Sequence, residues 1–231
     1  MLIKKYRVRV LSIVNPLEGV YTVEFESLNG KFKYAPGQFL HLALDTDYDG
    51  SGQWPESRCF SMQTNPENTS IKITYAVKGT FTSEMAKTLK IGTELWLKLP
   101  FGELFSQEHN KQKTVFIAGG TGVTPFLSLF THSSFAEYEN PVIYLGFRSK
   151  AFNIYDDDLQ AACSINAAGE SILRLVYQDR DGILDIEKIF SENGTDATYF
   201  ISGPPIMIRT FKQKLMQHGV PESNVKTDDW E

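Results

Sequence analysis

The sequence predicts two domains of different fold class: an antiparallel β-barrel followed by a parallel α/β domain. The main observation is a change of hydrophobic pattern near residues 106–113. Short alternating or apolar segments precede that stretch, whereas strands and helical segments alternate after it. A chain of 231 residues is also long enough to bury two separate cores. We therefore assign residues 1–108 to the barrel and residues 109–231 to the α/β domain.

The first domain is predicted to consist of short strands separated by turn residues, an arrangement typical of a small barrel or sandwich. The predicted strands are 5–14, 20–27, 38–44, 58–63, 70–77 and 93–99. One helix is predicted over residues 82–90. Thr82 is a suitable N-cap, Met85 and Leu89 share a face, and Gly92 follows the end of the run.

The second domain begins after the polar stretch 106–113, which is predicted to be a linker. The predicted strands are 114–118, 141–146, 171–177, 197–202 and 224–227. The predicted helices are 124–134, 155–166, 185–191 and 204–217. This alternation indicates a parallel sheet whose ligands bind at the carboxyl ends of its strands.

A glycine-rich turn after the first strand of the second domain is the most informative segment. Gly119, Gly120 and Gly122 follow an apolar strand and precede a helix that has Pro125 near its start. Glycines let the backbone approach a phosphate closely, and the start of a helix offers unpaired N–H groups to an anion. The turn predicts a site for a dinucleotide pyrophosphate. A plain tight turn is the alternative, because the spacing departs from G-x-G-x-x-G.

The charge pattern argues against a nucleic-acid partner. The net charge is −5, and it arises in residues 109–231, which hold 11 Lys/Arg against 16 Asp/Glu; residues 1–108 hold 12 of each. The most basic stretch, Lys4, Lys5, Arg7 and Arg9, alternates along a predicted strand. It is either a solvated strand face or a docking site for an acidic electron carrier.

The sequence also predicts no membrane span and no metal site. There is no apolar run of the length that a membrane helix needs, and charges occupy the place of a signal-peptide core, so we expect a cytoplasmic protein. Cys59 and Cys163 are far apart and form no C-x-x-C motif, and the four histidines are scattered. We expect any iron–sulfur partner to be a separate protein.

Seven short motifs occur in order along the chain. In the first half they are residues 36–40 (PGQFL), 58–61 (RCFS), 78–83 (KGTFTS) and 99–104 (LPFGEL). In the second half they are residues 118–125 (AGGTGVTP), 146–149 (GFRS) and 202–205 (SGPP). Together they resemble the ferredoxin–NADP reductase superfamily, in a stand-alone form without a fused iron–sulfur domain. The resemblance implies a flavin-binding barrel and a pyridine-nucleotide domain.

The resemblance places a flavin on the barrel. It assigns flavin contacts to Arg58, Cys59, Phe60, Ser61, Lys78, Gly79, Phe81 and Thr82. Arg58 can neutralise a phosphate at two points, and Phe60, on the same strand face, can lie against the flavin ring. By the family pattern Ser61 donates to flavin N5, which makes it a candidate catalytic residue. Phe60 replaces the usual tyrosine and lacks its hydroxyl. The alternatives are a surface ion pair for Arg58, a core position for Phe60 and a ligand-free N-cap for Thr82.

The resemblance also places a nicotinamide dinucleotide on the second domain. It assigns contacts to Gly120, Thr121, Gly122, Thr124, Arg148, Ser149, Arg180, Gly203 and Pro204. Ser202, at a position where the family often has cysteine, is expected near the nicotinamide. Asp228 and Trp230 are expected near the flavin, with a frayed tail as the alternative for Trp230. Ser202, Asp228 and Trp230 complete the candidate catalytic set.

The sequence leaves the choice of dinucleotide open. Arg148 and Arg180 can bind the 2′-phosphate of NADP, and their presence slightly favours NADP over NAD. Asp179 and Asp181 flank Arg180, and a carboxylate there suits the free 2′-hydroxyl of NAD.

A calcium-loop pattern, D-x-D-x-D-G-x5-E, spans residues 45–56. A strand is predicted before it and the flavin motif follows it, and Pro55 suits an EF-hand poorly. An acidic surface loop is therefore favoured over a calcium site.

These observations predict a flavoenzyme that takes hydride from NADPH or NADH onto FAD, with FMN as an alternative flavin. A ferredoxin or another one-electron carrier is the expected acceptor. Two alternatives remain: an NAD(P)H:flavin reductase that releases reduced free flavin, and a non-catalytic module that senses nucleotide or docks a partner.

Overall fold

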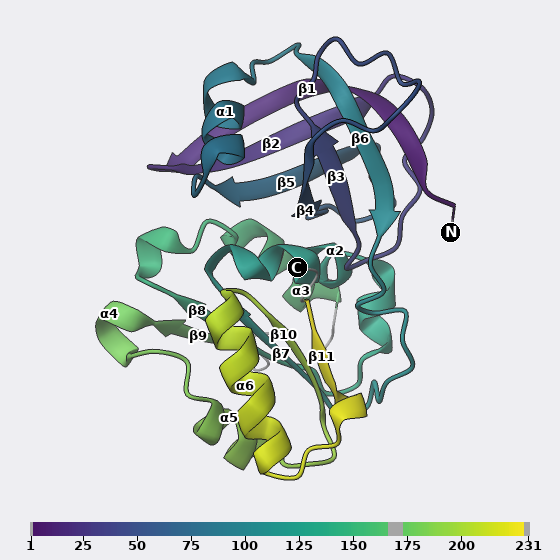
Figure 1. Cartoon of the computed structure of the whole chain (residues 1–231). Coiled ribbons are helices and arrows are strands. Elements are labelled where there is room, and N and C mark those ends of the chain that lie inside the picture. The colour runs from purple at the N-terminus through teal and green to yellow at the C-terminus, as the bar shows by residue number, and fades with distance from the viewer. Residues whose placement is uncertain (1, 166–172, 229–231) are drawn as a thin grey trace. The chain divides into compact units, whose positions relative to one another are not determined.

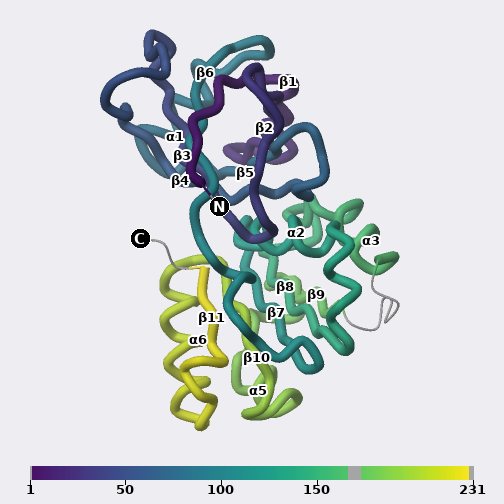
Figure 2. The backbone as a smooth tube through the Cα atoms, turned by 90° about the vertical axis from the view of Figure 1, so that its right-hand side faces the viewer, coloured from purple at the N-terminus to yellow at the C-terminus, as the bar shows by residue number. Residues whose placement is uncertain are grey.

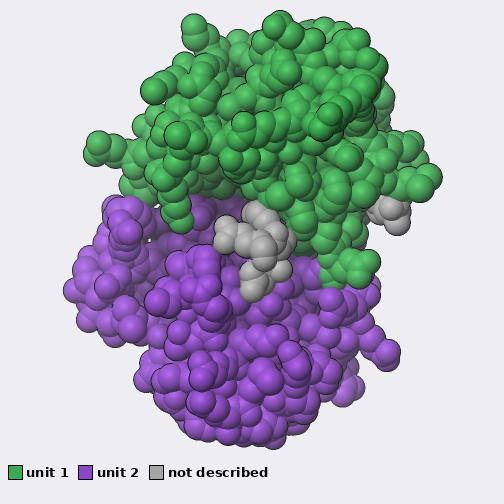
Figure 3. Space-filling view, viewed as in Figure 1, with its two compact units in different colours: residues 1–103 green, residues 104–231 purple. Residues whose placement is uncertain are grey.

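The computed structural model describes residues 2–165 and 173–228. The chain divides into two compact units, residues 1–103 (unit 1) and residues 104–231 (unit 2), which Figure 3 shows in different colours. No helix among the described residues is long and apolar enough to cross a membrane. The predicted fold class, an antiparallel barrel followed by a parallel α/β domain, is confirmed.

Unit 1 is a six-stranded antiparallel sheet with the strand order β4-β3-β6-β1-β2-β5 (Figure 1). Its strands are β1 (Lys4–Leu17), β2 (Val20–Ser27), β3 (Phe39–Ala43), β4 (Ser57–Ser61), β5 (Ser70–Ala76) and β6 (Glu94–Phe101). Alternate residues point into one apolar core, as Tyr6, Val8 and Val10 of β1 do. The two end strands, β4 and β5, also contact each other, which closes the sheet into a barrel.

The helix of unit 1 starts earlier than expected. Helix α1 spans Thr80–Thr88 and buries Met85 in the barrel core. Its N-cap is Gly79, so the prediction of Thr82 as the N-cap is wrong. The Thr82 hydroxyl instead accepts hydrogen bonds from the backbone amides of Lys78 (3.0 Å) and Gly79 (3.2 Å). A side chain in the first turn thus fixes the chain that enters the helix.

The basic residues of β1 are paired within unit 1. Arg7 and Arg9 both form ion pairs of 2.9 Å with Glu94 on β6. The Lys5 ammonium group donates to the carbonyl of Gly50 at 3.0 Å and to the hydroxyl of Tyr48. Lys5, Arg7 and Arg9, which were considered as a docking site for an acidic carrier, therefore make contacts that hold strands and a loop of unit 1 together.

The loop over residues 45–56 is held by turns and by an aromatic side chain. The Asp49 carboxylate accepts a hydrogen bond from the backbone amide of Ser51 at 2.8 Å. Gly50, at φ +92°, packs on the Trp96 indole so closely that a Cβ there would lie 2.4 Å from a ring carbon. Across residues 2–165 and 173–228, no three His, Cys, Asp or Glu side chains are grouped to hold a metal ion.

Unit 2 is a five-stranded parallel sheet with the order β11-β10-β7-β8-β9, which can be followed in Figure 2. Its strands are β7 (Thr114–Gly119), β8 (Val142–Phe147), β9 (Leu173–Tyr177), β10 (Thr198–Ser202) and β11 (Val225–Thr227). Its α-helices are α2 (Thr124–Phe130), α3 (Asp156–Ile165), α4 (Gln178–Asp181), α5 (Ile186–Asn193) and α6 (Pro205–Gln217). Short 3-10 helices are η1 (Gly120–Val123), η2 (Ser133–Glu137), η3 (Lys150–Phe152) and η5 (Glu222–Asn224).

Helices cover both faces of this sheet. On one face, Phe116 and Phe200 pack with residues of α2 and α3. On the other face, Ile117, Tyr199 and Ile201 pack with residues of α5 and α6. Because both faces are buried, the central strands are apolar throughout, as in the sequence VFIA of β7.

The polar stretch before β7 is fixed to unit 2, so the prediction of a linker over residues 106–113 is wrong. His109 lies between the carbonyl of Gln107 (2.7 Å) and the hydroxyl of Tyr138 (2.8 Å), and its ring stands edge-on to Phe200. The Asn110 carbonyl accepts from the Thr114 hydroxyl at 2.7 Å. Polar residues of this stretch make specific contacts with unit 2, which composition alone does not reveal.

Candidate functional site

The glycine turn of unit 2 lies where the strand order reverses. From β7 the chain proceeds to β8 and β9 on one side, and then returns to β10 on the other side of β7. The turn formed by η1 follows β7 directly, and Gly203 follows β10. In open α/β sheets, this switch point at the carboxyl ends of the strands is where ligands bind.

Two backbone segments meet closely at this switch point. A Cβ added to Gly122 would lie 2.4 Å from the Cα and 2.6 Å from the nitrogen of Gly203. Gly203 itself has φ +145°, a conformation that strongly favours glycine. At Gly120, in contrast, an added Cβ would meet no atom within 4 Å. The turn is therefore packed on the side of β10 and open at Gly120.

The other residues predicted around this turn have different surroundings. The Thr124 hydroxyl is buried and donates to the carbonyl of Thr121 at 2.9 Å, so it fixes the turn from inside. Pro204 is the N-cap residue of α6 and is exposed. The Thr124 side chain is thus engaged within the turn itself.

Two predicted catalytic residues come together beside the turn. The buried Ser202 hydroxyl donates to the Asp228 carboxylate at 3.1 Å, although the residues are 26 positions apart. Parallel pairing of β11 with β10 brings them together, and the Asp228 amide extends that pairing by donating to the Ile201 carbonyl at 2.9 Å. Trp230, the third residue predicted in this group, lies outside the described residues.

The predicted arginines follow the neighbouring strands. Arg148 comes directly after β8, and its guanidinium lies 5.8 Å from the centre of the Phe152 ring. Ser149 is the N-cap residue of η3. Arg180 lies in α4 after β9, and the Asp179 amide donates to the Arg148 carbonyl at 3.1 Å, which links the two strand ends. The contact between Arg148 and Phe152 could not be inferred from the sequence, because it depends on the fold of η3.

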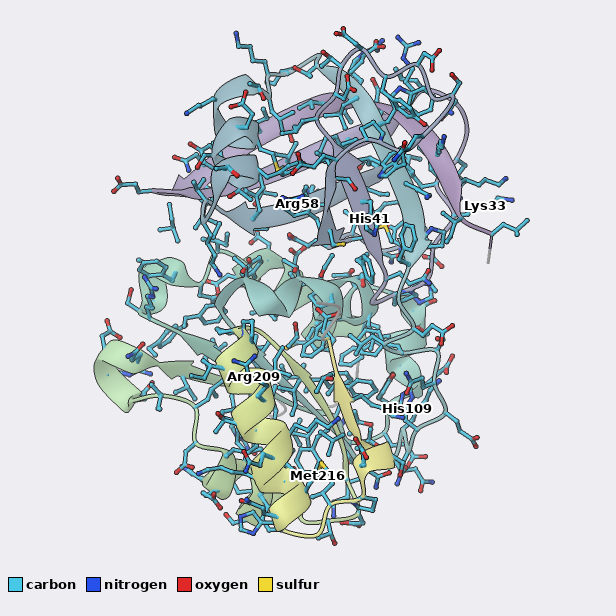
Figure 4. All side chains as sticks on the ribbon, viewed as in Figure 1. Lys33, His41, Arg58, His109, Arg209 and Met216 are labelled. Atoms are coloured by element: carbon cyan, nitrogen blue, oxygen red, sulfur yellow. The ribbon has the colours of Figure 1, made fainter. Side chains whose placement is uncertain are left out.

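On the barrel, Arg58 is half-exposed on β4 and is labelled in Figure 4. Its guanidinium lies 2.9 Å from the Glu56 carboxylate and 5.1 Å from the centre of the Phe81 ring. Lys78 and Gly79 are exposed at the start of α1, near Phe81 in sequence. The surface ion pair considered as the alternative for Arg58 is thus present, but an exposed pair of this kind is weak and exchanges readily for another anion.

Phe60, two residues further along β4, belongs to the barrel core. Its side chain is 8 % exposed, and its ring stands edge-on to Tyr75 at 5.9 Å between centres. Little of the ring remains to stack on a flavin unless neighbouring side chains move. Ser61, the last residue of β4, pairs with Phe39 of β3.

Cys59 points away from the face that Arg58 and Phe60 share. Its sulfur lies 3.4 Å from Nε2 of His41, the residue opposite it on β3 (Figure 4 labels His41). Burial, together with the charge of Lys98, lowers the pKa of His41, and burial raises the pKa of the Cys59 thiol. This thiol and imidazole contact is missed from sequence because it requires the β3 and β4 register.

The chain is similar in sequence or in fold to several known proteins. No family model matches the chain. The reductase component of propane 2-monooxygenase from Mycolicibacterium smegmatis is 26% identical over 218 residues, which are 87% of this chain and 60% of that protein. The chain thus spans about three fifths of that relative's length.

Two solved structures share the fold of the whole chain. The ferredoxin reductase in carbazole 1,9a-dioxygenase has a TM-score of 0.76 at 20% identity, over 100% of this chain and 70% of its own. The flavohem-like FAD/NAD binding domain of nitric oxide dioxygenase from Vibrio cholerae has a TM-score of 0.70 at 17% identity, over 96% and 97%. The chain is thus similar in sequence, along most of its length, to the reductase component of an oxygenase, and it shares the two-unit fold of FAD/NAD(P)-binding reductase modules.

Proposed function

We propose that the chain takes hydride from a reduced nicotinamide dinucleotide onto a bound FAD and passes the electrons to a ferredoxin-like carrier. The observation that carries this proposal is the backbone contact between Gly122 and Gly203 at the switch point, beside the hydrogen-bonded pair Ser202 and Asp228. Gly122 is required because the two turns approach so closely, and Gly203 also because of its φ of +145°. A close backbone approach of this kind suits a site that binds a pyrophosphate through backbone groups.

The residues of the barrel fit a flavin phosphate. Arg58 presents a half-exposed guanidinium that forms an ion pair with the exposed Glu56 carboxylate, and a phosphate can replace that carboxylate. We propose that Arg58, Lys78 and the start of α1 hold the flavin phosphates, while Ser61 lies at the reactive end. When bound, the flavin supplies the ability to accept hydride and to release electrons singly.

The residues of unit 2 would bind and orient the dinucleotide. The amides of Thr121 and Gly122 would hold the pyrophosphate, and Ser202 would lie at the nicotinamide. Its hydroxyl is aimed by Asp228, because a serine that donates to a carboxylate has a fixed orientation. Correct placement of this kind, together with exclusion of water, is the protein's contribution to hydride transfer.

Fewer observations support our proposals for the electron acceptor, the type of flavin and the cellular location. The relatives include a reductase component, and the Vibrio structure is named for FAD and NAD binding, which supports FAD and an electron-transfer role. Cys59 and Cys163 are far apart in the sequence and form no C-x-x-C motif, so we propose a separate iron–sulfur carrier as the acceptor. We also propose a cytoplasmic location.

Buried Phe60 favours a second candidate function. A ring that is 8 % exposed, and that lacks the tyrosine hydroxyl, offers little to hold a flavin. The flavin would then be a substrate that leaves in its reduced form.

An absorption spectrum of the purified protein, before and after anaerobic NADH or NADPH, tests both functions. We expect a yellow protein that keeps its flavin through gel filtration and is bleached by the dinucleotide. A colourless protein that reduces added flavin would support the second function. A colourless protein that oxidises neither dinucleotide in the presence of flavin would refute both and leave a non-catalytic module.

A further inference from the structure

We propose that the dinucleotide site of unit 2 is built for NADH and discriminates against NADPH, because Asp181 already occupies the Arg180 guanidinium that a 2′-phosphate would need. The inference rests on the proposed function, since it concerns the donor used at the same site. It replaces the slight preference for NADP that the sequence suggested. The two dinucleotides differ only at the adenosine 2′ position, which is a hydroxyl in NADH and a phosphate in NADPH.

Arg180 and Asp181 form a two-point ion pair at the carboxyl end of β9. Asp181 Oδ1 accepts from Arg180 Nε at 2.8 Å, and Oδ2 accepts from Nη2 at 2.9 Å. The backbone amide of Tyr177, the last residue of β9, also donates to Oδ2 at 3.0 Å. The carboxylate is therefore held by the strand end and holds the guanidinium in turn.

Aromatic packing restricts the same guanidinium further. Its central carbon lies 5.2 Å from the centre of the Tyr177 ring, and that ring is buried in the core of unit 2. Hydrogen bonds, first from Arg180 and then from the Tyr177 amide, lower the pKa of Asp181 to about 2. The carboxylate thus stays ionised throughout the neutral range, and it engages two N–H groups of the exposed Arg180 guanidinium. Unlike Glu56 beside Arg58, Asp181 is itself held, by the Tyr177 amide, so a phosphate has to compete with a fixed carboxylate.

The surrounding charge also disfavours a 2′-phosphate. A phosphate monoester carries a charge of roughly −1.5 to −2 at neutral pH. At this strand end it would face the carboxylates of Asp179 and Asp181, and it would have to displace the latter from Arg180. A 2′-hydroxyl needs only an acceptor, which a carboxylate at the end of the strand provides.

Binding of the oxidised dinucleotides, measured by calorimetry without flavin turnover, tests the inference. We expect the purified protein to bind NAD⁺ more tightly than NADP⁺ by about tenfold, the difference that one charge-assisted contact makes. Asp181→Asn should raise the affinity for NADP⁺ by about tenfold, because Arg180 is freed and a like charge is removed.

Two further variants distinguish the effect of breaking the ion pair from the effect of removing a negative charge near Arg180. Asp179→Asn removes the same charge from the same short helix but leaves Arg180 held by Asp181, so its gain in NADP⁺ affinity should be clearly smaller. Adding Arg180→Ala to Asp181→Asn should cancel most of the gain.

Equal gains in the two single variants, or a gain that survives Arg180→Ala, would overturn the role of the ion pair. Tighter binding of NADP⁺ than NAD⁺ by the unaltered protein would overturn the inference while leaving the proposed function intact. Failure to bind either dinucleotide would overturn both.

Discussion

The two predicted half-sites are built in different ways. In unit 2 the contact between Gly122 and Gly203 is made by backbone atoms, so the shape of the site depends on the absence of side chains. In unit 1 the corresponding group, Arg58, is a half-exposed side chain with an exchangeable partner in Glu56. Substitutions at Gly122 should therefore cause a large loss of binding, because an added atom collides with the backbone of Gly203. Substitutions near Arg58 should cause smaller losses, because exposed side chains can adjust.

The largest expected effect is that of Gly122→Ala. Its Cβ would lie 2.4 Å from the Gly203 backbone, and overpacking of this kind costs about 1–3 kcal/mol of unfolding free energy. We expect more than about tenfold loss of NAD⁺ affinity, measured by calorimetry, since the turn must move.

Gly219→Ala is the matched control, because it strains the backbone but its added Cβ does not collide with another atom. Gly219 has φ +86°, and an added Cβ there would meet no atom within 4 Å. It should destabilise the protein by about 1–2 kcal/mol, the cost of a left-handed residue, without loss of NAD⁺ affinity. Unchanged NAD⁺ binding by the Gly122→Ala protein would remove the contrast between the half-sites.

Arg58→Ala should lower flavin affinity by about tenfold to a hundredfold, the range for hydrogen bonds to charged groups. Fluorescence quenching of added FAD measures this. Glu56→Gln is the control, because it frees the guanidinium and should raise affinity by no more than about fivefold, given the small energy of an exposed ion pair. Equal flavin affinity in the Arg58→Ala and unaltered proteins would place the flavin elsewhere.

Asp228→Asn and Ser202→Ala should each slow flavin reduction by NADH by about tenfold, because each disrupts the same charge-assisted hydrogen bond. Anaerobic stopped-flow absorbance measures the rate. The double variant should be little slower than either single one, since both residues act through one contact. Fully additive losses would show that the two side chains act independently.

The smallest expected effect is on the pH dependence of stability and concerns His41 in unit 1 and His109 in unit 2. Burial is the main cause of the lowered pKa of His41 in unit 1 and of His109 in unit 2. The unfolded chain then binds protons more readily near the ordinary value of 6.5, so stability is complete above that pH and falls as pH decreases through it.

Urea unfolding at about pH 7.5 and 5.5 checks this expectation. His109→Gln and His41→Gln should each flatten the pH dependence of the transition of its own unit. A protein whose stability is the same at the two pH values would contradict the burial argument for both histidines.

The sequence predicted the fold well because most elements depend on local periodicity. Residues 20–27 were predicted as a strand and form β2 with the same bounds. The errors occur where a turn or a distant contact sets the end of an element. β1 continues to Leu17 because it forms a tight hairpin with β2. α2 ends at Phe130, before the 3-10 helix Ser133–Glu137. The link of His109 to Tyr138 is tertiary and leaves no local pattern.

The sequence predicted candidate residues for the site but not which of them contact each other. The family resemblance placed Ser202 and Asp228 among the candidates, yet only the parallel pairing of β10 with β11 shows that they touch. The pair formed by Arg180 and Asp181 involves adjacent residues and still could not be inferred, because it depends on how α4 turns after β9. The assigned ligand contacts stay predictions.

The attachment of residues 104–113 to unit 2 decides where this protein can be cut into parts. Phe105 packs against Phe116, Phe126 and Phe200, and His109 covers part of the same aromatic cluster. A gene fragment that begins at the first strand of unit 2 would omit these side chains and leave an aromatic surface exposed. Expression of unit 2 alone should therefore start at Leu104, the first residue of that unit.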